Sequence, residues 1–499
     1  MLPKENSPWI PEDWESIYDL YAEHDAWYSG DRLKLQEVYE RRVNIPTEKG
    51  RFWSRQIVDG QTKLHIPIAG EIAAVSADLL FSESPRIRIP EADSGGMFRT
   101  QERLEEIIER GGVIQRIHEG AEACSAMGGV FLKVNWDANQ YSFPILSIVQ
   151  ADNAIPEFQW GFLKAVTFWR ELTNDGYDEN VVYRHIERHE IVNGKAYIFN
   201  ALYRGTPTDL GKRLDLADHP DTAHLKGFES INTQLDTLPV RYVPNIRPNR
   251  RFRNHPIGHN LGISDYSGAE GAMDSLDETW TSWIRDIQLG KGRIIVNQQW
   301  LSRDEITGEF KFDGEQEVFT TLNMDPVSSK GVGFTVAQFD IRMEQHRQTA
   351  LELLDRIITN AGYSPQTFGL RIEGRAESGT ALNIRERRTT TTQGKKAVYW
   401  KKALEDILEI MLKVDAIHLK SGVEPARPNV EIKDTFQSDI MAVSTVVDMI
   451  SRAEAASIET KVRMIHPDWT EEQVQAEVDR IKEERGLKIP DDPIQVGVD

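Results

Sequence analysis

Two histidines four positions apart, His185 and His189, are the residues most suggestive of a metal site. Histidines with this spacing bind zinc together when they share one face of a helix. They lie in NVVYRHIERHE, however, whose β-branched and aromatic residues are typical of a strand. A spacing of four along a strand separates side chains by about 13 Å. We therefore expect neither a metal nor any other cofactor.

The only cysteine, Cys124, is the one candidate thiol nucleophile. It stands in the apolar stretch EGAEACSAMGGVFLKV, which favours a packed small residue over a reactive one. A lone cysteine also excludes an internal disulfide and a multi-cysteine zinc site.

Motifs of known catalytic mechanism are missing from the sequence. Residues 394–396, Gly-Lys-Lys, lack the upstream glycine of a phosphate-binding loop, and His118-Glu119 is not followed by the second histidine of a zinc protease. No G-x-G-x-x-G or G-x-S-x-G occurs. Acidic residues are plentiful, but none stands in a recognisable acid–base setting. The pattern predicts a structural protein and not an enzyme.

The charge balance restricts how the chain can meet nucleic acid. Its 499 residues carry 59 basic and 79 acidic side chains, a net charge of −20. Tight static binding to phosphates normally requires a basic protein. An acidic wall repels phosphate, however, and suits DNA that must slide past it.

One dense basic stretch, residues 240–260, departs from this acidic background. It has three prolines and no acidic residue, so we expect a linker. Its arginines have two open interpretations, which are contacts with acidic neighbouring domains or subunits and passing contacts with DNA phosphates. They are Arg241, Arg247, Arg250, Arg251 and Arg253.

Hydrophobic spacing predicts the elements that would position these residues. The first 125 or so residues have apolar positions three and four apart, which indicates a series of helices. Short β-rich segments from Val130 to about 205 indicate an antiparallel meander. Residues 206–239 are polar and irregular, as in a surface loop. The absence of a signal sequence or of a long apolar run predicts a soluble protein made in a cytoplasm.

The second half of the chain is dominated by long helices. Apolar stripes predict helices over 263–289 and 335–361 that flank a small β-rich insert. Helices of matched length are expected to return antiparallel, with the insert at their shared tip. A glycine-containing loop, 363–379, then precedes a helix that runs to about 420. Its four threonines and Gly394 favour a kink or break near 389–394. The tail is again helical.

This order of elements resembles the portal proteins of long-tailed phages with siphovirus-type necks, the head–tail connector rings of tailed bacteriophages. The similarity runs over about 60–490. It is carried by HIPIAGEIAAVSADLLFSESPRI, NHPIGHNLGISDYSGAEGAMDSLDETWTSW, NAGYSPQTFGLRIEGRAESGTALNIRERR and SRAEAASIETKVRMIHPDWTEEQVQAEVDRIKEER.

The resemblance implies an α+β portal fold with seven parts. They are an α/β wing (1–262), a first stem helix (263–290), a β-containing clip (291–334), a second, antiparallel stem helix (335–362), a tunnel loop (363–379), a kinked long wing helix (380–421) and a helical C-terminal crown (422–499). It also implies a homo-oligomeric ring, typically of twelve subunits, in the capsid of the virion. The ring forms the DNA channel for genome packaging and ejection.

The implied partners are double-stranded DNA in transit without sequence specificity, the terminase large subunit, a head–tail adaptor, the major capsid protein and a scaffolding protein, with no membrane. Assembly would take place in the host cytoplasm. The candidate tunnel-loop residues are Arg371, Glu373, Arg375 and Glu377. The candidate lumen-facing stem residues are Asp274, Asp277, Glu278 and Asp286. The candidate partner-binding residues of the clip are Arg303, Asp304, Glu305, Lys311 and Asp313.

Two rival interpretations stay open at this point. Another ring protein of the phage neck, an adaptor or stopper, would normally be much shorter and would lack the paired long helices. An acidic hydrolase that acts on carbohydrate or nucleic acid would be monomeric and would have a substrate pocket.

Overall fold

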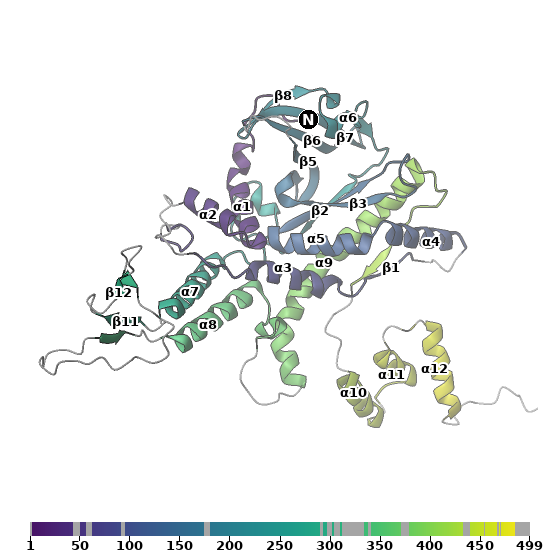
Figure 1. Ribbon diagram of the computed structural model, residues 1–499. Helices are drawn as coiled ribbons and strands as arrows, with labels where there is room; N and C mark the ends of the chain where they lie inside the picture. The colour runs from purple at the N-terminus through teal and green to yellow at the C-terminus, as the bar shows by residue number, and fades with distance from the viewer. Residues whose placement is uncertain are drawn as a thin grey trace, which may run out of the picture.

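The computed structural model describes most of the chain (Figure 1). The described residues are 2–42, 50–55, 62–90, 95–173, 180–289, 293–296, 302–303, 310–311, 334–337, 341–370, 379–432, 440–453, 455–466, 469 and 471–484.

The predicted N-terminal helices are confirmed. After a short 3-10 turn, η1 (Glu12–Trp14), come α1 (Glu15–Ser29), α2 (Arg32–Arg41), α3 (Ile68–Phe81), α4 (Gly95–Arg110) and α5 (Val113–Met127). Gly30, with φ +66°, ends α1 in the left-handed conformation that glycine tolerates best. Asp31 then caps α2 by accepting from the Leu33 N–H at 2.8 Å.

The predicted β region is present as two antiparallel sheets. One has the order β10 (Val240–Pro244), β2 (Gly129–Asn135), β3 (Ile145–Gln150). The other is a meander of β4 (Ala154–Gln159), β5 (Phe162–Leu172), β6 (Val182–Val192), β7 (Lys195–Thr206) and β8 (Asp209–Leu214). The irregular loop expected over 206–239 is wrong, because β8 and β9 (Ser230–Asn232) both pair with β7, with α6 (Pro220–Ala223) between them.

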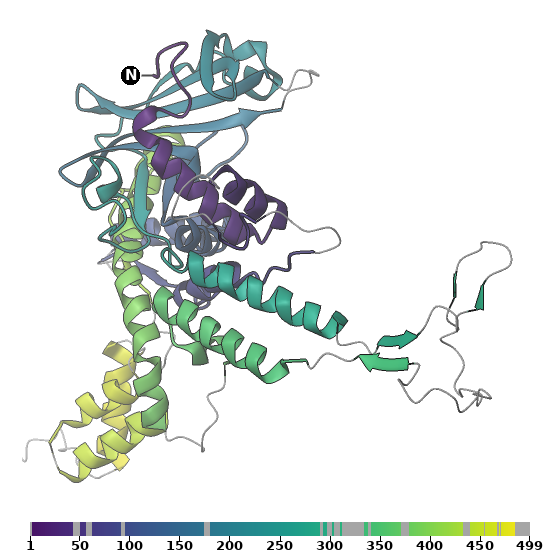
Figure 2. The ribbon, with the colours of Figure 1, turned by 90° about the vertical axis from the view of Figure 1, so that its left-hand side faces the viewer.

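The second half of the chain contains the long helices α7 (Glu270–Leu289), α8 (Met343–Ala361) and α9 (Gly379–His418). Figure 2 shows α7 and α8 side by side, leading away from the body of the molecule. Beyond them β11 (Arg293–Val296) and β14 (Phe334–Ala337) form an antiparallel ladder. In the described residues α7 and α8 therefore lie side by side, with the β11–β14 ladder beyond them.

Both helices of this hairpin begin later than predicted. The first was expected from residue 263, but Gly268 has φ +90°, which a right-handed helix cannot contain, and α7 begins at Glu270. The second was expected from residue 335, but Phe334–Ala337 pairs with β11, and α8 begins at Met343. Strand pairing between distant segments overrides local helix spacing here.

A kink or break was expected near 389–394, and a break is absent there, because α9 is one continuous helix of 40 residues. The hydroxyls of Thr390 and Thr391 donate to carbonyls four residues earlier, at 3.3 and 2.7 Å, and so are satisfied inside the helix. After α9, β15 (Asn429–Glu431) pairs with β1 (Arg86–Arg88). The tail contains α10 (Ile440–Arg452), α11 (Ile458–Ile465) and α12 (Glu471–Glu484).

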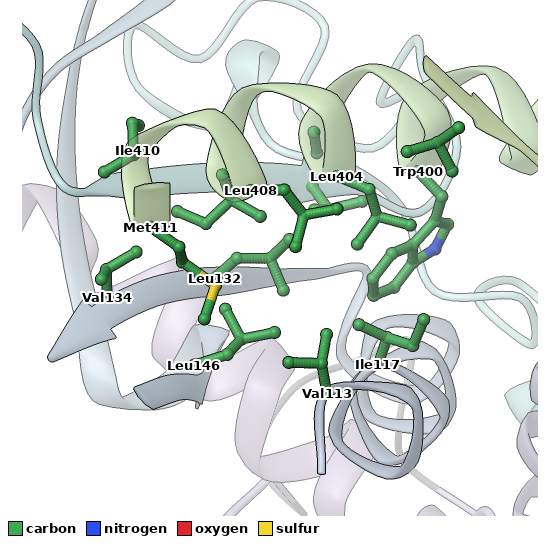
Figure 3. Packing of buried hydrophobic residues seen from close by; sticks show 14 of the residues in the cluster. Val113, Ile117, Leu132, Val134, Leu146, Trp400, Leu404, Leu408, Ile410 and Met411 are labelled. Carbon is green, nitrogen blue, oxygen red and sulfur yellow. The ribbon is translucent and has the colours of Figure 1, made fainter. Parts of the chain in front are cut away.

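The largest core lies between α9, α5 and the three-stranded sheet. Figure 3 shows Trp400, Leu404 and Met411 of α9 above Leu132 of β2 and Ile117 of α5. The buried residues Trp400, Leu404, Ile407 and Met411 therefore form the face that holds α9 on the body.

The packing of the core predicts that substitutions at two positions of α9 lower stability by very different amounts. Leu404 is fully buried, whereas Val398 is 68% exposed. Leu404→Ala is expected to cost about 2–5 kcal/mol of stability, because it leaves a cavity that close-packed neighbours cannot fill. Val398→Ala, on the same helix, should change stability by less than about 0.5 kcal/mol. Urea unfolding followed by circular dichroism measures both, and equal midpoints for the two variants would contradict this packing.

Candidate functional site: the helical hairpin and its root

The α7–α8 hairpin is anchored at one end only. Near the body, Met273 and Leu276 of α7 and Ile357 and Ile358 of α8 are buried in a cluster that also includes residues of α1 and α3. Farther out, Ile287 is 42% and Met343 60% exposed. The end of the hairpin near the body is thus buried and fixed, whereas the other end projects into solvent.

The acidic residues in the first half of α7 hold the segment before α3. The Asp274 carboxylate accepts the backbone N–H groups of Phe52 and Trp53, at 2.8 and 3.1 Å. Asp277 accepts from the Trp53 indole at 2.9 Å and from the Ile66 N–H at 2.9 Å, and it contacts His65 Nδ1 at 2.8 Å. Burial raises the pKa of Asp274 above its ordinary value, against the lowering effect of the two backbone donors.

The prediction that Asp274 and Asp277 face the lumen is wrong. Asp274 and Asp277 are 6% and 1% exposed in a single chain, so they cannot face a channel. The apolar stripe suggested that acids beside it meet solvent, but residues 50–55 and 62–67 cover that face. Glu278 is partly exposed and bonds Arg55 at 2.5 Å.

Asp286 takes part in a clasp across the outer half of the hairpin. Its Oδ2 contacts His346 Nε2 at 3.0 Å and accepts from Arg342 Nε at 3.0 Å, both at the start of α8. Trp283 stacks on the His346 ring, with centroids 6.2 Å apart and planes 9° apart. The hydrogen bonds from His346 and then Arg342 lower the pKa of Asp286. The outer halves of the two helices are therefore joined by the contacts of Asp286 with His346 and Arg342.

A buried ion pair lies at the root of the hairpin. The Lys396 ammonium of α9 bonds the carboxylate of Asp265, which precedes α7, and the two side chains are 1% and 0% exposed. Lys396 also donates to Ser76 Oγ of α3 at 2.6 Å and to the Tyr363 hydroxyl at 2.8 Å. All three ammonium protons therefore have acceptors, as a buried charge requires.

The Asp265 carboxylate is equally well satisfied. It accepts from Ser125 Oγ of α5 at 2.6 Å, from the Tyr363 hydroxyl at 2.8 Å and from Asn245 Nδ2 at 2.7 Å. Burial and the adjacent Asp265 hold the pKa of Tyr363 well above its ordinary value. Tyr363 directly follows α8 and its Gly362 cap, so this cluster fixes the start of one hairpin helix and the end of the other on α9 and the body.

Threonines of α9 hold the chain that leaves α8. Thr392 Oγ1 donates to the Gly362 carbonyl at 2.7 Å, and the Ser364 N–H donates to Thr389 Oγ1 at 2.9 Å. Thr367 Oγ1, in the 3-10 turn η6 (Pro365–Phe368), donates to Glu386 Oε2 at 2.8 Å. The predicted loop 363–379 thus begins as a short, fixed segment along α9.

Most of the candidate loop and insert residues lie outside the described part of the chain. Arg371, Glu373, Arg375 and Glu377 lie outside the described residues, as do Asp304, Glu305 and Asp313. Arg303 and Lys311 lie on β12 (Ser302–Arg303) and β13 (Phe310–Lys311), which pair antiparallel. The structure brings these two backbone segments together.

The basic stretch 240–260 makes contacts within the chain. Arg241 approaches Asp406 of α9 at 3.5 Å, and Arg251 approaches Glu23 and Glu270 at 3.8 and 3.7 Å. The Arg247 guanidinium donates to the Asn260 carbonyl and lies over the Tyr242 ring. Arg241 and Arg251 therefore contact acidic residues of their own chain. Arg250 and Arg253 are exposed.

The candidate metal ligands His185 and His189 and the candidate nucleophile Cys124 are held by contacts within the fold. His185 and His189 lie on β6, as expected, and contact Asn200 at 3.1 Å and Glu187 at 2.6 Å. Burial raises the pKa of the Cys124 thiol, which is in the main core. Within the described ranges no cluster of three metal-binding side chains occurs. No helix in those ranges has the length and apolarity that a membrane crossing requires.

Sequence reasoning missed the Lys396–Asp265 pair. Lys396 was read only as part of an incomplete phosphate-binding motif. A signal was present, because Lys396 lies four residues before Trp400 and continues the apolar stripe of α9. A lysine on a buried face implies a buried partner, although its identity depends on the fold.

Comparison with known proteins gives a family match over nearly the whole chain. The family model described as "Phage portal protein, SPP1 Gp6-like" matches residues 9–490. A chain of the solved structure "Virion of native gene transfer agent (GTA) particle" is 13% identical, covering 92% of this chain and 96% of that one, with a TM-score of 0.37. A chain of "Neck of empty GTA particle computed with C6 symmetry" is 14% identical, covering 79% and 89%, with a TM-score of 0.36. No curated protein matches.

The buried pair predicts a large effect of removing one charge. Lys396→Met leaves Asp265 buried without its cation, which is expected to cost about 3–5 kcal/mol of stability. Lys396→Met combined with Asp265→Asn should recover much of the loss, since neither charge is then buried. Lys401→Met, at a half-exposed position of the same helix, is the control. Thermal melting of the purified proteins tests this, and a Lys396→Met variant as stable as the control would refute it.

Proposed function

The chain belongs to the phage portal protein family of the SPP1 Gp6-like type, and on that premise we propose how its parts build the portal. It is a structural subunit of a multimeric portal ring in a phage-like particle, the head–tail connector of the virion. We propose a ring of twelve copies without catalytic activity of its own.

The α7–α8 hairpin is the observation that carries the proposal. A channel through a ring needs an element that projects from each subunit and is fixed firmly at its base. The buried cluster of Lys396, Asp265 and Tyr363 supplies the base, and the clasp of Asp286 with His346 keeps the helices together farther out. We assign α7 and α8 as the stem, which therefore begins at Glu270 and resumes at Met343.

With the stem assigned, the clip, tunnel loop, wing and crown are assigned from their order along the chain. The insert between the helices, with the β11–β14 ladder, is the clip. Residues 363–379 are the tunnel loop, and α9 is the long wing helix. Residues 1–262 form the wing, and α10, α11 and α12 belong to the crown. The fixed turn η6 supports the loop assignment, because it leads the chain away from α8 along α9 before residue 371.

The partners are assigned to these parts by their position. The clip, with Arg303, Asp304, Glu305, Lys311 and Asp313, would contact the terminase large subunit and later the head–tail adaptor. The wing would contact the major capsid protein and a scaffolding protein during assembly in the host cytoplasm.

The channel is proposed to pass double-stranded DNA without reading its sequence. The net charge of −20 disfavours tight binding to phosphates, so friction on moving DNA stays low. Glu278 and Asp286 remain candidates for the wall, although each already bonds a basic residue of its own chain. Arg371 and Arg375 are candidates for passing contacts with phosphates.

Ring formation is the first expectation. The purified full-length chain should appear in negative-stain images as rings with a central hole. Monodisperse single chains at micromolar concentration would instead count for the acidic-hydrolase interpretation, and rings should be separated from aggregates by light scattering.

A second expectation concerns the tunnel loop. Arg371→Glu with Arg375→Glu should leave ring assembly intact but lower the amount of packaged or retained DNA, because the loop would repel phosphates. Arg99→Glu with Arg116→Glu, on α4 and α5, makes the same change of charge elsewhere. DNA protected from nuclease in assembled particles is the readout. Packaging at the wild-type level by the loop variant would contradict the proposed contact between the tunnel loop and DNA.

A further inference from the structure

One stretch of α9 carries basic residues and no acidic one. Between Glu386 and Glu405 the sequence has six lysines and arginines and no aspartate or glutamate. Lys396 is buried in its pair with Asp265, and the other five basic residues are exposed. In a chain of net charge −20 this is a local concentration of positive charge. The five exposed residues are Arg387, Arg388, Lys395, Lys401 and Lys402.

Helical geometry places these five side chains on one side of α9. At 3.6 residues per turn their positions fall within an arc of about 140° around the helix axis. Lys396, Trp400 and Leu404 fall on the opposite side, and Figure 3 shows Trp400 and Leu404 pointing from α9 into the core. The basic side is therefore the solvent face of a helix whose other face is fixed to the body.

Most of the charges on this basic face have no partner of opposite sign. Lys401 approaches Glu405, one turn farther along α9, at 3.9 Å. Within the described part of the chain the other four side chains form no ion pair. Like charges gathered on one face repel one another, and an anionic partner would remove that repulsion.

The middle of the basic face is open to a large partner. Gly394 lies on this face between the arginines and the last two lysines, and it is exposed. Beyond the helix itself, nothing lies within 4 Å of the position that a Cβ would occupy there. Glycine weakens an exposed helix relative to alanine, and no described neighbour needs the space that it leaves. A partner that approaches the helix backbone closely would need that space.

We propose that the basic face of α9, from Arg387 to Lys402, binds the phosphate backbone of double-stranded DNA. At 1.5 Å per residue the face is about 22 Å long. Over that length a duplex carries about 13 phosphate charges, so a row of cations meets a row of anions. Contacts with phosphates carry no sequence information, which suits DNA that passes without being read.

The inference rests on the proposed function, because a portal ring brings duplex DNA past α9. This helix begins at Gly379, where the proposed tunnel loop ends. Arg387 lies eight residues farther on, about 12 Å along the helix. DNA that touches the tunnel loop therefore passes close to the start of the basic face.

DNA suits this face better than an acidic surface of an adjacent subunit does. The centre of a protein–protein interface is depleted in charged residues, and lysine is depleted in such interfaces as a whole. From Arg387 to Lys402, all described, the one large apolar side chain that is exposed is Val398. The hold on DNA is weak, because the net charge of −20 repels phosphates elsewhere on the chain. DNA can therefore still move.

DNA binding by the assembled full-length ring tests the proposal. Arg388→Gln, Lys395→Gln and Lys402→Gln together remove three exposed charges and keep good helix formers. Fluorescence anisotropy of a short labelled duplex at low salt should give a dissociation constant higher than that of the wild type by about tenfold or more. The slope of log affinity against log salt should also become shallower by about two to three, because each lost phosphate contact removes about 0.9.

Two controls separate the position of the charges from their number. Exchange of lysine for arginine and of arginine for lysine at the same three positions keeps every charge, and this chain should bind like the wild type. Arg99→Gln, Arg116→Gln and Lys226→Gln remove three exposed charges elsewhere and should leave the slope unchanged. Circular dichroism and melting temperature check that each variant folds, and analytical ultracentrifugation checks that it forms rings.

Several outcomes would overturn the binding of DNA by this face. They are wild-type rings that bind no duplex at low salt, an α9 variant with the affinity and slope of the wild type, and an equal loss when the three charges are removed elsewhere. Loss of rings by the α9 variant would assign the face to a contact between subunits instead. Failure of the wild-type chain to form rings would overturn the portal proposal itself, so the two failures are distinct.

Discussion

The buried pair of Lys396 and Asp265 is the interaction on which the rest of the structure depends. A charge in the protein interior is tolerated only when its partner and its remaining hydrogen bonds are all in place. Here those partners come from α3, α5, the residue after β10, the segment before α7, the residue after α8, and α9. Six segments distant in sequence must reach one point, and the geometry of the hairpin root follows from that requirement.

The α7–α8 hairpin leaves apolar side chains exposed in a single chain. Two helices can bury one face against each other, but their outer faces stay in solvent unless something else packs there. Ile287, Met343 and Leu351 are 42%, 60% and 41% exposed on the projecting hairpin. Neighbouring hairpins in a ring would cover such residues, so the ring and the channel are proposed to form together. Within a single chain, Asp286 joins the two helices through its contacts with Arg342 and His346.

Local patterns in the sequence predicted the elements well and their contacts poorly. Apolar stripes were enough to identify α7 and α8, because helical periodicity is a local property. The start of α7 at Glu270 depended on the conformation of Gly268. The burial of Asp274 and Asp277 depended on Trp53, more than two hundred residues earlier. Lys396 could be suspected from its place on an apolar stripe, but only the fold identifies Asp265 as its partner.

The central claim is that the α7–α8 hairpins of identical subunits surround one channel. A cryo-electron microscopy reconstruction of the purified full-length chain tests it most directly, since it locates both helices relative to the symmetry axis. The account predicts a closed ring in which α7 and α8 lie next to the axis and the β11–β14 ladders gather at one mouth. A ring with these hairpins on its outer rim, or an assembly without a central channel, would contradict it.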